Sequence, residues 1–129
     1  MKQIRLSGSG GQGVITAAII LAEAAVNEGK EARGGASKAE VIISDQPIYH
    51  PKVLAPGLVL AMTQKAADKY YKDLRTDGTL VLDSDLVPEP PDFPHVIRIP
   101  ITKLAVEEVG KSLFANIVAL GALVRITGI

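Results

Sequence analysis

The segment "GSGGQG" at residues 8–13 separates a short apolar stretch, Ile4 to Leu6, from a long apolar stretch that begins at Val14. Glycine adopts positive φ at little steric cost, so closely spaced glycines let a chain turn sharply from a strand into a helix. The segment therefore predicts a first strand that ends near Leu6 and a first helix that begins near Val14. It also matches the pattern G-x-G-x-x-G, in which backbone amides at a helix N-terminus can hold an anion.

The pattern leaves two interpretations of this glycine turn open. The residues that would form an anion-facing turn are Gly8, Gly10, Gly11, Gln12 and Gly13. A strand-to-helix turn without any ligand needs similar glycines. A dinucleotide site also requires an acidic residue about 20 positions further on, at the end of a second strand. Glu28 and Glu31 lie near that spacing, but neither ends an expected strand.

Strands and helices alternate along the rest of the chain. The expected strands are 4–6, 39–45, 58–62, 79–84 and 95–99, and the expected helices are 14–26, 64–74, 103–110 and 112–124. Thr63 and Thr102 are expected N-caps. The segment "EARGGASK" at 31–38 is polar, glycine-rich and unlike a strand, so either the second strand of the fold is missing or this segment is a functional loop. The alternation predicts one α/β domain over residues 1–129, a three-layer sandwich with a mostly parallel sheet and a Rossmann-like glycine turn after its first strand.

Composition narrows the classes of function. The chain has 14 Lys and Arg against 14 Asp and Glu, so no net field draws the whole chain to nucleic acid or to an anionic membrane. It has no cysteine, which excludes a disulfide, a thiolate nucleophile and a cysteine-ligated zinc or iron–sulfur centre within these residues. The longest apolar stretch, 113–124, is shorter than the roughly 18 residues of a membrane span. We expect a cytoplasmic protein without nucleic-acid or membrane partners.

Other polar residues give weaker indications of function. Asp45, Asp83 and Asp85 lie at the ends of expected strands, and no metal or catalytic spacing accompanies them. We therefore expect these carboxylates to cap turns. His50 and His95 have no second catalytic side chain nearby in the sequence, so we assign neither a role.

Several segments carry a family resemblance when they are taken together. "GSGGQGV" at 8–14 and "EARGGASKAEVIISDQPIYHPKV" at 31–53 are followed in order by "LVLAM", "LVLDS" and "NIVALGALV". Over nearly its whole length the chain resembles the gamma subunit, or the corresponding fused domain, of the 2-oxoacid:ferredoxin oxidoreductases. The second segment looks more like the 2-oxoglutarate branch of that family than the pyruvate branch.

The resemblance implies an accessory subunit that is inactive in isolation. Complexes of this family oxidatively decarboxylate a 2-oxoacid to an acyl-coenzyme A and pass the electrons to ferredoxin. The resemblance implies thiamine diphosphate, magnesium, iron–sulfur clusters and coenzyme A for the complex, and no cofactor bound by this chain alone. Its expected partners are the alpha, beta and delta subunits, with ferredoxin as an indirect partner; a homodimer of the isolated chain stays open.

The family also suggests roles for particular residues. The gamma part helps to form the coenzyme A region, so the glycine turn would face an anion there, and Arg33, Gly34 and Gly35 would form a loop at a subunit interface or above the coenzyme. An arginine fork suits a phosphate or carboxylate. Taken without the family, Arg33 is better explained as a solvated loop residue or as part of an intersubunit ion pair. No catalytic residue and no metal ligand is expected in this chain.

A second class of function remains open from the sequence. G-x-G-x-x-G on its own favours a free-standing dinucleotide-binding domain of Rossmann type. The two classes differ in an observable way, because an accessory subunit is expected to bind neither NAD nor FAD. It is also expected to expose apolar surface for its partners. A homo-oligomer with a purely structural purpose is a third class that stays open.

The chain departs from the family pattern in two places. Family members carry an extended strand and a turn of the "SYGPE" type before the arginine-glycine-glycine segment, whereas Lys30 here directly precedes Glu31. They also continue beyond the position of Ile129. We therefore expect the natural protein to carry a loop between 30 and 31 and a C-terminal tail that the printed sequence omits. Its intact mass should exceed 13.6 kDa, and a measured mass of 13.6 kDa would contradict this expectation.

Overall fold

The structure is a computed structural model. It describes residues 2–8, 13–34, 39–44, 55–110 and 115–128.

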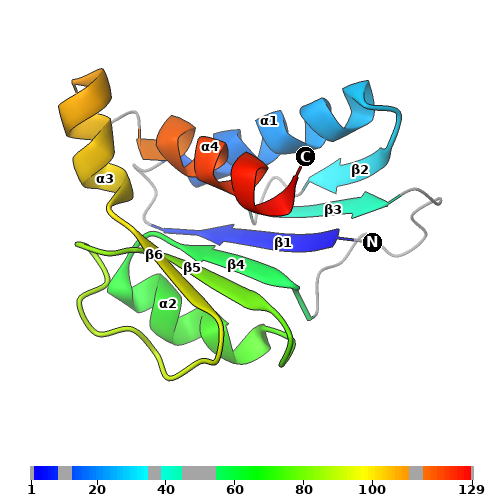
Figure 1. The fold of residues 1–129 in the computed structure, drawn as a ribbon. Coiled ribbons are helices and arrows are strands. Elements are labelled where there is room, and N and C mark those ends of the chain that lie inside the picture. Colours follow the sequence, from blue (N-terminus) through cyan, green and yellow to red (C-terminus); the bar gives the residue numbers. More distant parts are fainter. Residues whose placement is uncertain (1, 9–12, 35–38, 45–54, 111–114, 129) are drawn as a thin grey trace.

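Within these ranges six strands form one sheet, in the order β2-β3-β1-β4-β5-β6 (Figure 1). The strands are β1 Lys2–Ser7, β2 Glu31–Gly34, β3 Glu40–Ser44, β4 Leu58–Ala61, β5 Thr79–Asp83 and β6 Val96–Ile99. β1, β4, β5 and β6 pair in parallel, whereas β3 runs antiparallel to both β1 and β2. The prediction of an α/β fold with a mostly parallel sheet is therefore confirmed.

Helices cover both faces of this sheet. They are α1 Val14–Asn27, α2 Gln64–Tyr70, α3 Ile101–Leu104 and α4 Ala115–Thr127, with a 3-10 turn η2 Tyr71–Asp73 after α2 and a π-helical turn η3 Ala105–Val109 after α3. α1 and α4 lie side by side on one face and α2 lies on the other, which gives the predicted three layers (Figure 1). Each face has its own apolar core, because strand side chains alternate between the two faces.

The predicted loop over 31–38 is wrong for its first half. Residues 31–34 form β2, in which Glu31 pairs with Ser44 and Gly34 pairs with Val41 of β3. β2 is an edge strand, where polar residues are tolerated, and strand formation depends on the partner strand more than on the segment itself. The second strand that appeared to be missing is therefore present at the edge of the sheet.

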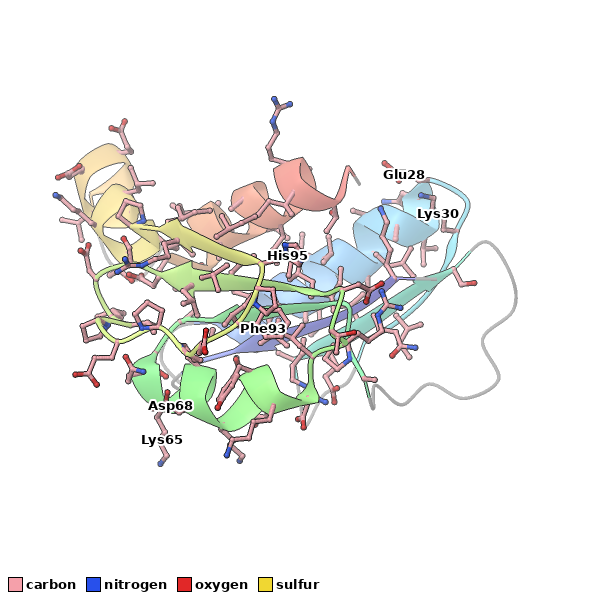
Figure 2. The ribbon with its side chains drawn as sticks, turned by 60° about the horizontal axis from the view of Figure 1, so that its bottom comes forward. Glu28, Lys30, Lys65, Asp68, Phe93 and His95 are labelled. Atoms are coloured by element: carbon pink, nitrogen blue, oxygen red, sulfur yellow. The ribbon has the colours of Figure 1, made fainter. Side chains whose placement is uncertain are left out.

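The connection from α1 to β2 is short. α1 ends at Asn27, and Gly29 has a φ of 84°, a left-handed conformation that reverses the chain. Lys30 then donates its backbone N–H to the carbonyl of Ala25 at 3.1 Å, and β2 begins at the next residue. Glu28 and Lys30 flank this turn at the far end of α1 from the glycine turn (Figure 2).

The expected cap Thr63 is confirmed, and the expected cap Thr102 is wrong. The Thr63 hydroxyl oxygen accepts from the backbone N–H of Ala66 at 3.2 Å, which caps α2. α3 begins one residue before Thr102, so Thr102 lies inside the helix. Its backbone N–H donates to the carboxylate of Asp83 at the end of β5 at 2.9 Å. A side chain from a distant strand therefore accepts the hydrogen bond of a free N–H group in the first turn of this helix.

Candidate functional site

The parallel strands end at one edge of the sheet, where their connections diverge. The backbone N–H of Met62 donates to the carbonyl of Ser7 at 2.8 Å, so the ends of β1 and β4 are neighbours. From this point α1 leads over one face toward β2 and β3, whereas α2 leads over the opposite face toward β5. In open α/β sheets, ligands bind outside the carboxyl ends of the strands at such a switch point.

Both ends of the glycine turn lie at this switch point. Gly8 follows β1 directly, and Gly13 is the N-cap of α1 with φ 70° and ψ 25°. No side chain caps the start of α1, and an uncapped helix N-terminus of this kind is suited to binding an anion. Gly10, Gly11 and Gln12 lie outside the described residues.

Asn116 of α4 is a neighbour of the turn that the sequence did not indicate. A Cβ atom placed on Gly13 would lie 2.7 Å from Nδ2 of Asn116, so the two residues are in close contact. The available signal was modest: Asn116 is the only polar side chain within the apolar segment "NIVALGALV".

The arginine-glycine-glycine segment lies elsewhere on the sheet. Arg33 and Gly34 belong to β2, which is separated from β1 by β3. The pairing places Arg33 level with Gln3 of β1. Strand spacing and rise then put its backbone about 10 Å across and about 17 Å along the sheet from Gly8. The described residues therefore do not bring Arg33 next to the glycine turn, and Gly35 lies outside them.

A partly buried ion pair network lies beneath β1, on the face that α2 covers, with Arg5 and Glu40 inside and Asp73 at the surface. The side chain of Arg5 is 8% exposed and pairs with Glu40 of β3 at 3.0 Å and with Asp73 of η2 at 2.6 Å. Its guanidinium also lies 5.2 Å from the ring centre of Tyr70, a cation–π distance. The network joins β1, β3 and the end of α2, so its role is structural.

The carboxylate of Asp83 is fully buried at the carboxyl end of β5. Oδ1 accepts from the backbone N–H groups of Asp85 at 3.0 Å and Leu86 at 3.2 Å. Oδ2 accepts from the backbone N–H of Thr102 at 2.9 Å and from its hydroxyl at 2.7 Å. The predicted turn-capping role of Asp83 is confirmed, and the carboxylate also fixes the start of α3.

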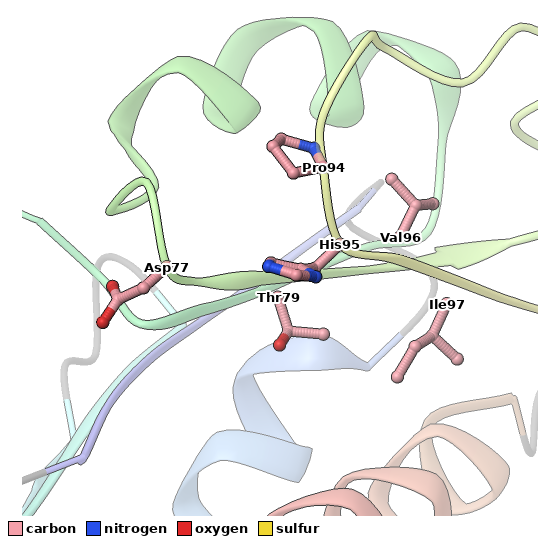
Figure 3. Close-up of a pocket in the computed structure, with 6 residues that line it drawn as sticks. All are labelled: Asp77, Thr79, Pro94, His95, Val96 and Ile97. Atoms are coloured by element: carbon pink, nitrogen blue, oxygen red, sulfur yellow. The ribbon is translucent and has the colours of Figure 1, made fainter.

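A shallow hollow of about 510 Å³ lies at the opposite edge of the sheet (Figure 3). It is lined by Asp77, Thr79, Pro94, His95, Val96 and Ile97. These residues precede or begin β5 and β6, so the hollow lies away from the switch point. Among the described residues, no three His, Cys, Asp or Glu side chains gather as a possible metal site.

The geometry beside β1 differs from that of a dinucleotide site. Such a site needs a parallel strand next to the first strand, with a free carboxylate at its end. Here the neighbour on that side is β3, which runs antiparallel to β1. β3 supplies one carboxylate near the carboxyl end of β1, that of Glu40, and it forms an ion pair with Arg5.

Comparison with known proteins identifies the family. The model of the pyruvate ferredoxin/flavodoxin oxidoreductase family matches residues 3–129. The chain belongs to this family. Members similar to it include a 2-oxoglutarate synthase subunit KorC from Methanocaldococcus jannaschii, which is 46% identical over 99% of this chain and 76% of its own length. The resemblance seen in the sequence is therefore confirmed.

Two further members of the family extend the comparison. The crystal structure of a keto/oxoacid ferredoxin oxidoreductase gamma subunit from Geobacter sulfurreducens superimposes with a TM-score of 0.90 and is 43% identical, over 98% of this chain and 76% of that one. A pyruvate synthase subunit PorC from Methanothermobacter thermautotrophicus is 34% identical over the whole of this chain and 78% of its own length. Among the described helices, none has the length and apolar character that a membrane crossing requires.

Proposed function

We propose that this chain is the gamma subunit of a complex that oxidatively decarboxylates 2-oxoglutarate to its acyl-coenzyme A and passes the electrons to ferredoxin. The observation that carries the proposal is the 46% identity to a 2-oxoglutarate synthase subunit, against 34% for a pyruvate synthase subunit. Thiamine diphosphate, magnesium and the iron–sulfur clusters then belong to the alpha, beta and delta subunits. This division agrees with the absence of cysteine from these 129 residues.

Within that complex, the glycine turn serves the coenzyme A region. Coenzyme A carries phosphate groups, and a helix N-terminus behind a glycine turn is suited to phosphate. The support for this role is the position of Gly8 and Gly13 at the switch point. Arg33 lies on the edge strand β2 and away from the turn, so we assign it to a subunit interface together with Gly34 and Gly35.

Reconstitution tests the subunit role and the substrate together. The other subunits are purified without this chain, and the reduction of a low-potential dye is measured with coenzyme A and either 2-oxoglutarate or pyruvate. Adding the chain should restore the rate, with 2-oxoglutarate preferred. A full rate without the chain would contradict the subunit role, and a preference for pyruvate would contradict the assigned branch.

Gly13→Ala tests the glycine turn. The substitution places a side chain at positive φ, which costs about 1–2 kcal/mol, and pushes a methyl group against Asn116. We expect the KM for coenzyme A in the assembled complex to rise about tenfold, which corresponds to about 1.4 kcal/mol. The KM for the 2-oxoacid should change little, because its site lies in other subunits.

Gly29→Ala is the matched control for this experiment. Gly29 also has positive φ, at the other end of α1, and nothing lies within 4 Å of an added Cβ. Its backbone strain is therefore similar, without any effect on the turn. An equal rise in the KM for coenzyme A in both variants would contradict a specific role of the glycine turn.

The relatives carry residues that this chain lacks, and we propose a position for them. The alignment with the relative from Methanocaldococcus jannaschii runs over 143 positions, more than the 129 residues of this chain. That relative therefore carries residues inside the aligned region that this chain lacks. We propose that they fall between α1 and β2, where the present connection consists of Glu28, Gly29 and Lys30.

A further inference from the structure

The contact between Gly13 and Asn116 is so close that a side chain at position 13 would require Asn116 to shift. An added Cβ would lie 2.7 Å from Nδ2, 3.0 Å from Cγ and 3.2 Å from Cβ of Asn116. The contact thus includes the base of the asparagine side chain as well as its flexible end. Glycine is favoured at position 13 both by its φ of 70° and by the space that Asn116 occupies.

Asn116 is held in place by the core beneath it. Its neighbour Ala115 and the residue one turn later, Ala119, are both 1% exposed in the core between α4 and the sheet. α4 also packs along α1. The backbone of Asn116 therefore cannot move away from Gly13 without a loss of core packing.

The amide of Asn116 takes no part in the hydrogen bonding of the described residues. No hydrogen bond or ion pair of this half-buried side chain is found among them, whereas Ser7 and Asp83 at the same edge of the sheet are both hydrogen-bonded. Toward the described residues, Asn116 therefore presents a branched side chain that packs against Gly13 and no hydrogen bond.

We propose that Asn116 is a positioning residue for the glycine turn, because it fixes the point at which the turn becomes α1. The role in coenzyme binding rests on the proposed function, whereas the positioning itself does not. Asn116 acts through Gly13, whose carbonyl accepts the backbone N–H of Ala17 at 3.1 Å. Hydrogen exchange of the Ala17 amide therefore reports directly whether the position of Gly13 is fixed.

Two variants at position 116 test whether the shape of the Asn116 side chain or its amide group is what matters. Asn116→Ala removes the branched part of the side chain, and Asn116→Leu keeps a side chain of the same branching and number of heavy atoms without the amide. Hydrogen exchange of the Ala17 amide in the full chain is the first measurement. We expect exchange about tenfold faster in Asn116→Ala, and a return to near the original rate in Asn116→Leu.

An internal reference distinguishes positioning from general loss of stability. The backbone N–H of Glu28 donates within the last turn of α1, far from Asn116, and its exchange should stay unchanged in both variants. Equal acceleration at Ala17 and Glu28 would overturn the proposal, as would an unchanged Ala17 rate in Asn116→Ala. Fast exchange at Ala17 in Asn116→Leu would also overturn it, because the amide would then matter more than the shape.

The KM for coenzyme A, measured in the complex with the same variants, distinguishes the positioning of Gly13 by Asn116 from the role of the glycine turn in coenzyme binding. A KM that rises with the Ala17 exchange rate, at unchanged kcat, supports both the positioning and the coenzyme role. If the exchange rates follow the expectation and the KM does not change, the positioning stands and the coenzyme role of the turn fails.

Discussion

Replacing Asp83 with alanine is expected to lower the free energy of unfolding by about 3 kcal/mol. The carboxylate is fully buried and accepts from three backbone N–H groups and one hydroxyl. Alanine would leave these donors without their partner, and α3 would lose the acceptor at its start. The loss should appear as a lower midpoint in urea, with an unchanged slope, in the purified chain.

Asp85→Ala is the control for this prediction. Asp85 is exposed two residues further along, and its removal should change the free energy of unfolding by less than about 0.5 kcal/mol. Asp83→Asn should lie between the two, because asparagine keeps one oxygen acceptor and replaces the other with a donor. A loss in Asp83→Ala no larger than in Asp85→Ala would show that the carboxylate does not hold β5 and α3 together.

Removing the cation of Arg5 should have an effect of similar size. Arg5→Met keeps much of the side-chain length and leaves Glu40, with a side chain 13% exposed, without its partner. Breaking a buried pair from one side costs about 3 kcal/mol, because the remaining carboxylate stays buried. The free energy of unfolding, measured in urea, should therefore fall by about that amount.

The exposed ion pair of Arg75 and Asp77 provides the control for the Arg5→Met variant. Their side chains are 53% and 78% exposed, so Arg75→Met should cost no more than about 1 kcal/mol. The double variant Arg5→Met with Glu40→Gln should recover part of the loss, since it removes the unpaired charge as well. A double variant less stable than Arg5→Met would contradict the account of a buried, uncompensated carboxylate.

Local sequence patterns predicted most of the secondary structure. The apolar runs at 58–62 and 79–84 became β4 and β5, and the glycine turn separated β1 from α1 as expected. β2 was missed because a polar segment such as 31–34 becomes a strand only through its partner β3. Thr102 was misassigned for a similar reason, since the acceptor at the start of α3 comes from β5.

The candidate site was only partly predictable. Six residues of sequence are enough to recognise the glycine turn, and its place at the switch point follows from the order of strands and helices. The contact of Gly13 with Asn116 joins distant segments and has no local signal. The same holds for Arg5 and Asp73, which are 68 residues apart in the sequence. The position of Arg33 relative to the glycine turn could not be predicted from the sequence, because it depends on the strand order, which separates β2 from β1.

The most direct test of the account is to purify this chain, under anaerobic conditions, from the cells that make it and to identify the proteins that accompany it. We expect alpha, beta and delta subunits that carry thiamine diphosphate and iron–sulfur clusters. We also expect the assembly to reduce a low-potential dye when 2-oxoglutarate and coenzyme A are supplied. A chain that is recovered alone and binds NAD tightly would contradict the account.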